Sequence, residues 1–352
     1  MSYQDGFAAL NLIMPDRIPR TEYSVEAHWD LIKAVTGLNV NIHSSSHEKI
    51  VAGNAFRKAW NYDVIWSVLI HSQVFDGKCT KMGHATYSAG GADYDDCQYC
   101  LYSDPNDALK FDPWEMYGSK DPAVLIRNFN EHYDKSCHSY KDAVNMTGIY
   151  VTMMSGLIEI FGWNMLLLIA GLDPTGFGEV SDKYASWIRQ YFNALAECNA
   201  PVVMVHDDIV WTLGAFIHPD WYRKYIFPNY KKLLQPLIES GKKILFTSDG
   251  NYTEFIDDLA DCGFNGFVLE PLTDMKYIAE KYGKTHSFIG NVDTRILLSG
   301  TKENIYNEVK RCVDIGKNCP GFIMAVGNHI PANTPVENAL YYNEVYEKLS
   351  KR

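Results

Sequence analysis

The chain has 352 residues, of which 47% are hydrophobic and 21% charged, and its formal net charge is −11. This composition is typical of a globular protein large enough for one elaborated barrel or for two domains. The negative charge argues against nucleic acid as the main partner, because phosphate binding needs clustered Lys and Arg. The longest apolar run, Met165–Leu172, is too short to span a bilayer, and the N-terminus lacks a signal-peptide pattern. We therefore expect a cytoplasmic protein that does not cross a membrane, with its eight cysteines as free thiols.

The first 120 residues predict a helical cap, a strand and a long insertion. Residues 1–60 are expected to form a helical N-terminal extension, because Glu22–Val40 carries apolar residues at helical spacing. The apolar run Asp63–Ile70 predicts the first strand. Residues 76–120 are dominated by Gly, Asp, Tyr and Cys, and a loop of this length in a compact domain is often functional. His84 in this loop is a candidate catalytic residue if the loop folds over the site.

Helices and strands then alternate along the chain. Residues 121–142 predict a helix, Thr147–Met154 predicts the second strand, and two helices are expected at Leu157–Ala170 and Val180–Ala196. Five short apolar runs follow, and each ends abruptly in polar side chains: PVVMV before His206, KILFT before Ser248, GFVL before Glu270, SFIG before Asn291 and GFIMAVG before Asn328. A last helix is expected at Pro335–Leu349.

Near-continuous apolar strands that alternate with helices are typical of a parallel sheet covered on both faces. The pattern predicts an α/β fold, a (β/α)8 TIM barrel, in which seven strands are assigned and the eighth is not. Because no linker divides the chain, we expect one domain over residues 1–352. The C-terminal ends of barrel strands meet at one mouth, where the active sites of such enzymes lie. The polar residues that end the five runs are therefore expected around one opening.

The residues after PVVMV are the first candidates for chemistry. Neighbouring strand residues point to opposite faces, so only one of Asp207 and Asp208 faces the mouth directly. One of these carboxylates can instead cap the following segment. The functional interpretation assigns His206 and Asp207 to substrate binding, and Asp208 to holding substrate or protonating a leaving oxygen. Glu270 is a second candidate acid, and its alternative is a solvated strand end.

A metal site is predicted at the same mouth. Asp249 is either a helix cap or turn residue, or a carboxylate that binds metal or substrate. His329 follows the last strand and is expected to face the acidic residues. One His with two or three carboxylates suits a borderline divalent ion such as zinc, with one coordination position left for substrate. Asn291 at the end of SFIG is assigned to substrate binding.

Several long segments of the sequence resemble those of a known family. The segments HDDIVWTLGAFIHPDWYRKYIFPNYKKLLQPLIESGKKILFTSDGNYTEFIDDLADCGFNGFVLEP, GNVDTRILLSGTKENI and NHIPANTPVENALYY resemble the uroporphyrinogen decarboxylase superfamily. Within it, the chain is most similar to the corrinoid-dependent methyltransferase branch, especially the methyltransferase components of O-demethylases. The resemblance covers residues 145–345 well and the N-terminal part loosely. It implies that a partner protein carries the corrinoid, since the chain has no Asp-x-His-x-x-Gly cobalamin motif.

The chain departs from two branches of the superfamily. Porphyrinogen decarboxylases carry an Arg-rich N-terminal segment that binds substrate carboxylates, whereas the early segment here has only Arg17 and Arg20. Thiol-methylating members hold zinc with a His-x-Cys and a distant Cys, whereas the matching positions here are Thr247-Ser248-Asp249 and His329. A site without thiolates suits an oxygen-bearing substrate better than thiol activation.

The O-demethylase components are associated with an acidic-x14-Glu-x20-His zinc pattern, which Asp293, Glu308 and His329 match. Glu308 would lie about two turns into a helix that begins near Thr301, and barrel helices run away from the mouth. Asp249, Asp293 and His329 are therefore the preferred metal ligands, and Glu308 is a further candidate.

The leading hypothesis is an enzyme that moves a methyl group from a small methoxylated or methylated substrate to the Co(I) corrinoid of a partner protein. An aromatic methyl ether is the expected substrate, and zinc or another divalent metal is the expected Lewis acid. Two alternatives stay open: a lyase like the porphyrinogen decarboxylases, and a non-catalytic barrel that binds a corrinoid protein. A homodimer is one alternative for the oligomeric state.

Overall fold

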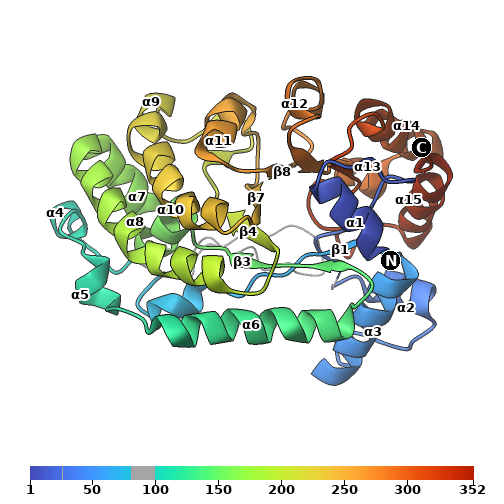
Figure 1. Cartoon of the computed structure of the whole chain (residues 1–352), viewed down its shortest axis with the longest axis horizontal. Helices are drawn as coiled ribbons and strands as arrows, with labels where there is room; N and C mark the ends of the chain where they lie inside the picture. Colours follow the sequence, from blue (N-terminus) through green and yellow to red (C-terminus); the bar gives the residue numbers. More distant parts are fainter. Residues whose placement is uncertain (26, 81–99) are drawn as a thin grey trace.

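The computed structural model of the protein describes residues 1–25, 27–80 and 100–352 (Figure 1). Its centre is a parallel sheet in the order β10-β9-β8-β7-β4-β3. The bounds are β3 Thr147–Ile149, β4 Val202–His206, β7 Lys243–Thr247, β8 Gly266–Val268, β9 Ser287–Ile289 and β10 Phe322–Ile323. A second parallel pair joins β1 (Val64–Ile65) to β2 (Val144–Asn145), and β2 leads almost directly into β3. All seven predicted strands are therefore present.

A segment near the N-terminus closes the barrel between β10 and β1. Arg20 forms a parallel bridge with Met324, whose N–H donates to the Pro19 carbonyl (2.8 Å). On the other side, the Asp63 N–H donates to the Arg20 carbonyl (2.8 Å). Residues 19–21 thus occupy the eighth strand position, and the fold is the predicted (β/α)8 barrel.

The expected N-terminal helical cap is only partly correct, because the closing strand lies inside it. Helices flank that strand: α1 Tyr3–Leu10, α2 Trp29–Thr36 and α3 Ser46–Ala59. Helix α2 packs against α15 (Val336–Leu349), so the two ends of the chain meet on one side of the barrel (Figure 1).

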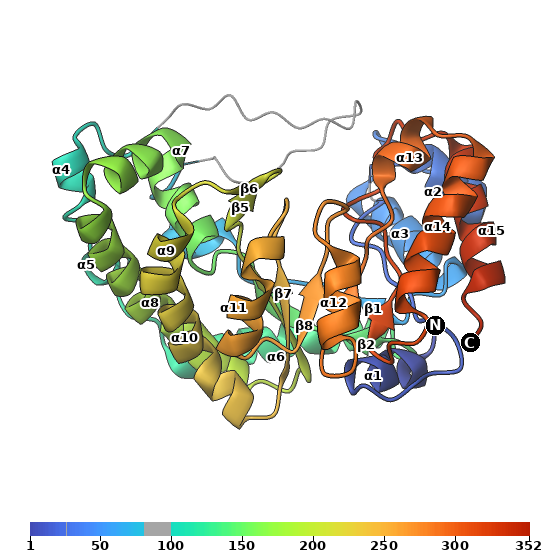
Figure 2. The ribbon, with the colours of Figure 1, turned by 90° about the horizontal axis from the view of Figure 1, so that it is seen from above.

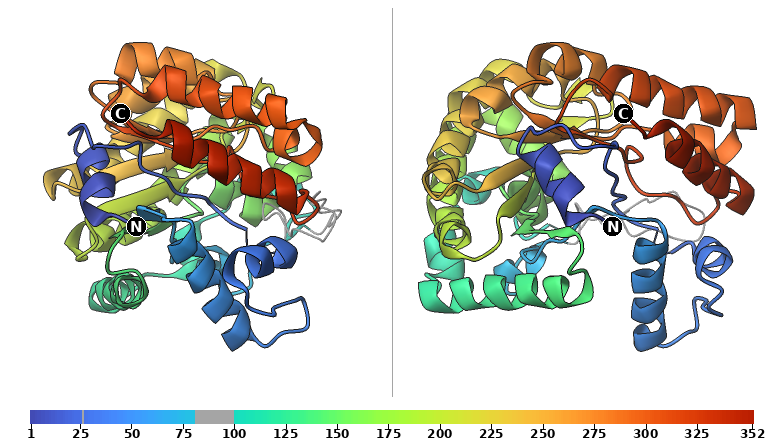
Figure 3. Two further views of the ribbon diagram at one scale, coloured as in Figure 1. Left: turned by 90° about the vertical axis from the view of Figure 1, so that its right-hand side faces the viewer. Right: turned by 45° about the vertical axis from the view of Figure 1, so that its right-hand side comes forward.

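Helix α1 closes the end of the barrel at which the strands begin (Figure 3). Ala9 and Leu10 of this helix pack against the inward side chains of the strands, which are Val64, Val144, Met146, Val202, Met204, Leu245, Val268, Ile289, Ile323 and Ala325. Gly6 permits the close approach, since a Cβ atom there would lie 2.5 Å from the Asp63 carbonyl oxygen. The opposite end, where the strands terminate, carries the polar residues.

The remaining helices form the outer layer around the strands (Figure 2). They are α6 Pro122–Ser139, α7 Met154–Leu172, α8 Pro174–Glu197, α10 Phe227–Glu239, α11 Ile256–Cys262, α12 Met275–Tyr282, α13 Thr294–Ser299 and α14 Lys302–Gly316. Helix α9 (Pro219–Trp221) continues through a π-helical turn into α10. The predicted insertion contains the short helices α4 (Pro105–Ala108) and α5 (Pro113–Tyr117). An antiparallel hairpin of β5 (Val210–Trp211) and β6 (Gly214–Ala215) follows β4.

Helix α7 is long and apolar enough to cross a membrane by length and composition alone, which the apolar runs of the sequence did not indicate. In the structure 61% of its apolar 18-residue window is buried. It packs against α4 and α8, and Gly162, with φ of 68°, divides it by a kink. Burial against neighbouring helices accounts for its hydrophobicity, so α7 belongs to the protein core.

Candidate functional site

The alternation of side chains along β4 carries His206 and Asp208 into the barrel mouth. Val202 and Met204 point into the barrel core, so His206 points the same way, and Asp208 is two residues further on. Asp207 falls on the other face, among the surrounding helices. Only one of the adjacent carboxylates therefore faces the mouth, as predicted, and it is Asp208.

Asp207 holds the start of α7 in place. Its carboxylate accepts N–H groups from Met153 (3.1 Å) and Ser155 (2.6 Å) and the hydroxyl of Tyr230. Burial raises the pKa of Asp207 to about 6, against the opposing effect of these hydrogen bonds. The sequence analysis assigned this carboxylate to substrate binding. In the structure its oxygens accept hydrogen bonds from these three donors, so Asp207 stabilises the backbone next to the site.

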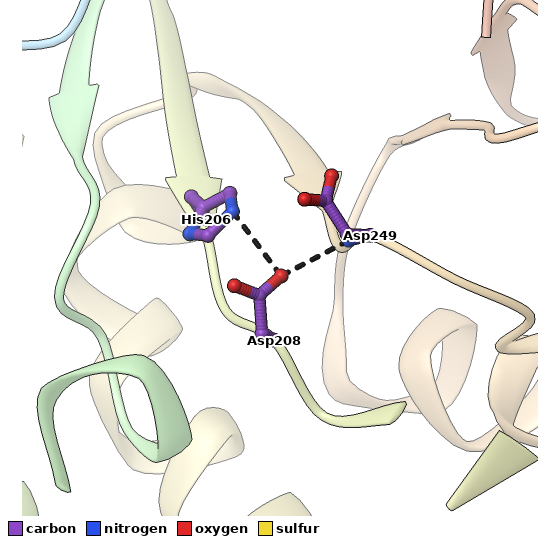
Figure 4. A group of neighbouring side chains, drawn as sticks. All are labelled: His206, Asp208 and Asp249. Carbon is purple, nitrogen blue, oxygen red and sulfur yellow. Dashed lines mark hydrogen bonds and ion pairs between the residues drawn. The ribbon is translucent and has the colours of Figure 1, made fainter. Parts of the chain in front are cut away.

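His206, Asp208 and Asp249 form a compact group at the mouth (Figure 4). The Nε2 atom of His206 lies 3.3 Å from Oδ1 of Asp208, and the Asp249 N–H donates to that same oxygen (3.0 Å). Each residue offers one ligand atom, and the three atoms lie within 4.8 Å of one another. One imidazole and two carboxylates with this spacing could hold a divalent metal ion.

The orientation of the His206 ring suits a metal ligand. Its Nδ1 lies 3.1 Å from the Tyr150 carbonyl, which can only accept a hydrogen bond, so Nε2 is turned toward Asp208. The ring also stacks on Tyr150, with centroids 3.6 Å apart. Burial lowers the pKa of His206, but the charge and hydrogen bond of Asp208, together with the charge of Asp249, outweigh burial and raise the pKa to about 9.

The acidic side chains at the mouth of the barrel give it an excess of negative charge. Asp249 is open to the cavity but surrounded by protein, and burial together with the charges of Asp208 and Glu270 raises its pKa to about 8. Burial also raises the pKa of Glu270, whose oxygens accept Nδ2–H of Asn328 (2.6 Å) and the Gly250 N–H (2.7 Å). Carboxylates that are difficult to ionise together favour binding of a cation.

A cavity of about 90 Å³ is lined by His206, Asp249, Glu270 and Asn328. Tyr23, Trp66 and Tyr150 form its aromatic part, and burial together with nearby acidic charges raises the pKa of Tyr23. The sequence analysis missed all three. Trp66 could have been predicted from the same alternation of side chains that located His206, because it is two residues after the inward-facing Val64.

The other predicted site residues lie apart from this group. Asp293 caps α13 and pairs with Arg295 (2.6 Å), and Glu308 pairs with Arg311 (2.7 Å). Among the described residues, neither Asp293, Glu308 nor His329 belongs to a set of three whose ligand atoms could share one ion.

Two mouth residues and one loop residue complete the predicted set. Asn291 is buried and uses its amide for the Glu270 and Thr273 carbonyls (both 3.2 Å) and for Arg311. Its contacts are thus made within the barrel wall. Burial lowers the pKa of His329 to about 4, so this imidazole is neutral, and Nδ1 lies 3.1 Å from the Asn328 side-chain oxygen. His84 lies outside the described residues.

The raised pKa of Asp249 predicts how the metal-free protein responds to pH. Its folded-state pKa lies above the unfolded value, so the stability that it contributes is lost as the pH rises from about 4 to about 8. The variant Asp249→Asn should therefore unfold at a higher temperature than the wild type near pH 8 and show a smaller difference between pH 5 and pH 8. Thermal unfolding with a chelator measures this, and identical pH profiles for the two proteins would contradict it.

Comparisons with known proteins place the chain in a family. It is 17% identical to a methyltransferase from Methanosarcina mazei, with a TM-score of 0.65 over 98% of each chain, which shows a shared fold. The uroporphyrinogen decarboxylase of Carboxydothermus hydrogenoformans is 29% identical over 210 residues, 59% of this chain and 58% of that protein. The corresponding protein of Geobacter sulfurreducens is 26% identical over 179 residues, 51% of each. The chain thus matches about half the length of these relatives. The pattern of the uroporphyrinogen decarboxylase (URO-D) family covers residues 146–349, and the chain therefore belongs to that family.

Proposed function

We propose that the protein is a methyltransferase that moves a methyl group from a small methylated substrate, with an aromatic methyl ether as the leading candidate, to the Co(I) corrinoid of a partner protein. The observation that carries the proposal is the His206, Asp208 and Asp249 group beside a small acidic cavity. The likeness in fold to a methyltransferase over nearly the whole chain supports it. The partner would dock over the barrel mouth, since the methyl group has to reach its cobalt.

The same cavity is poorly suited to decarboxylation of a porphyrinogen. A substrate with several carboxylates needs cationic side chains, and none of the described residues that line the cavity is Lys or Arg. We therefore prefer methyl transfer to the activity named for the curated relatives.

The residues at the mouth fit a divalent metal, and zinc is the leading candidate. His206 through Nε2, Asp208 and Asp249 would hold it, while the Tyr150 carbonyl fixes the imidazole and Ser155, whose Oγ accepts the Asp208 N–H (2.8 Å), steadies Asp208. When bound, such an ion supplies Lewis acidity to the heteroatom that loses its methyl group. We prefer these ligands to the set that contains Asp293, Glu308 and His329, because arginines neutralise the two acids of that set.

The remaining lining residues would position the substrate. Asn328 and the Gly250 N–H hold the Glu270 carboxylate at the cavity wall. Trp66 and Tyr23 give an apolar surface next to it. A Lewis acid stabilises a departing oxygen without a proton, so the proposed reaction does not require Asp208 or Glu270 as a proton donor. The proposal also includes that the protein is cytoplasmic and consists of one domain. The cysteines in the described part of the chain are free thiols, which is consistent with that location.

The test is a methyl-transfer assay. Purified protein loaded with zinc is mixed with free cob(I)alamin and a panel of methoxylated and other methylated compounds, and methyl-Co(III) formation is followed by absorbance. We expect methyl-Co(III) to form with at least one small donor, and to need both metal and protein. Release of CO2 from a carboxylated tetrapyrrole, without methyl transfer from any donor, would establish the lyase alternative instead.

A further inference from the structure

The aromatic wall of the cavity is a corner made by two rings. Tyr23 and Trp66 lie with their ring centroids 5.0 Å apart and their planes at 79°. Both side chains also pack on the apolar core inside the barrel, which holds them at the cavity floor. Tyr150 contributes less, because the His206 and His71 rings both stack on it, with centroid distances of 3.6 and 5.2 Å. The faces available to a ligand are therefore those of Tyr23 and Trp66.

Glu270 brings a negative charge to the same cavity. Both donors that bind its oxygens, the Asn328 amide at 2.6 Å and the Gly250 N–H at 2.7 Å, are uncharged. Across the described residues that line the cavity, Lys and Arg are absent. Arg295, outside that lining, also acts on Glu270 through its charge, but its guanidinium donates its hydrogen bonds to Asp293 (2.6 Å for the ion pair). Glu270 therefore has no direct cationic partner among the described residues that line the cavity, and a ligand cation can fill that place.

We propose that Tyr23, Trp66 and Glu270 bind a methylated ammonium group of the substrate. A quaternary or protonated nitrogen near the face of a Trp or Tyr ring is attracted by the negative charge of that face, and aromatic corners recognise such cations in this way. An uncharged ring would gain contact with Trp66 but nothing from the charge of Glu270. The inference rests on the proposed function and adds this ammonium group to the proposed substrate. It is a recognition group apart from the methoxy oxygen that the metal would bind, because a quaternary or protonated nitrogen has no lone pair for a metal.

The charges of the two halves of the cavity agree with this assignment. Asp208 and Asp249 together balance one divalent ion at the metal group. Glu270 is then left to balance one monovalent organic cation. Substrate and metal would thus occupy neighbouring positions without repelling each other through an excess of positive charge.

The test compares choline with its uncharged carbon analogue, in which a tert-butyl group replaces the trimethylammonium group. Isothermal titration calorimetry of the wild-type protein, in about 0.15 M salt to screen the net charge, needs neither corrinoid nor methyl donor. We expect choline to bind at least about tenfold more tightly than its analogue. Equal affinity for the two, or no binding of choline, would overturn the proposal.

Variants locate the binding site. Trp66→Leu and Glu270→Gln should each weaken choline binding by about tenfold or more, while Trp66→Phe should retain most of it because a ring face remains. Glu280→Gln, at an exposed position paired with Lys276, is the matched control for loss of one negative charge. Choline binding that persists in both Trp66→Leu and Glu270→Gln would remove this cavity as the site.

The two proposals can fail separately. Choline binding without methyl transfer from any donor would refute the transferase and leave the cation site standing. Methyl transfer from uncharged ethers in a protein that does not bind choline would refute the cation site and leave the transferase standing.

Discussion

Replacing His206 by alanine is expected to remove the divalent ion and, with it, methyl transfer. Substitutions that only disturb the support of a ligand already cost about 10–100-fold in metal affinity, so loss of the ligand itself should cost about 100-fold or more. Asp249→Ala should behave in the same way, because its carboxylate completes the group with Asp208. Metal content after dialysis and competition with a chromophoric chelator measure the affinity, and the cob(I)alamin assay measures activity.

His329→Ala is the matched control for the loss of an imidazole at the mouth. His329 lies on the same face of the barrel but outside the group of three, so this variant should keep its metal. Glu308→Ala should keep it too, since Glu308 pairs with Arg311. Metal loss in these two variants, with retention in His206→Ala, would instead establish the ligand set that the family resemblance implied.

Replacing Glu22 by alanine is expected to lower the free energy of unfolding by about 3–5 kcal/mol, the usual cost of leaving one partner of a buried ion pair uncompensated. Glu22 accepts hydrogen bonds from Arg20 (2.9 Å) and the Tyr342 hydroxyl (2.7 Å), and its second oxygen accepts the Val326 N–H (2.8 Å). Arg20 is fully buried, with its guanidinium 4.5 Å from the Trp60 ring centroid. Urea unfolding followed by circular dichroism measures the loss.

This pair joins the closing strand to the C-terminal part of the barrel, so the effect should extend beyond the local contacts. Glu22→Gln, which keeps the shape and one acceptor, should lose less than Glu22→Ala. The exposed pair of Lys276 and Glu280 is the control, and Glu280→Ala should change stability far less because solvent screens surface ion pairs. A Glu22→Ala protein as stable as Glu280→Ala would show that the buried pair does not hold the barrel closed.

The strands could be predicted from sequence because buried parallel strands are marked by local composition. PVVMV and KILFT are apolar on both faces, and both are strands in the structure. The eighth strand could not be predicted, since Pro19-Arg20-Thr21 has no apolar run. These three residues take the eighth strand position, through an isolated bridge and backbone hydrogen bonds, only because β10 and β1 present open edges on either side.

Part of the candidate site could also be predicted, because it too depends on local sequence. Alternation along a strand depends on backbone geometry alone, so the sequence indicated that one of Asp207 and Asp208 faces the mouth. The pairs of Asp293 with Arg295 and of Glu308 with Arg311 were also readable from the sequence, because their members lie only two and three residues apart.

By itself, the sequence determined the barrel class and the acidic character of the mouth, because both follow from residue types at regular spacing within single strands. The tertiary structure alone decided that His206, Asp208 and Asp249 meet, and that Trp66 and Tyr23 stand in the same cavity. Distances between residues on different strands are set by register and closure around the barrel, and no local stretch of sequence encodes those distances.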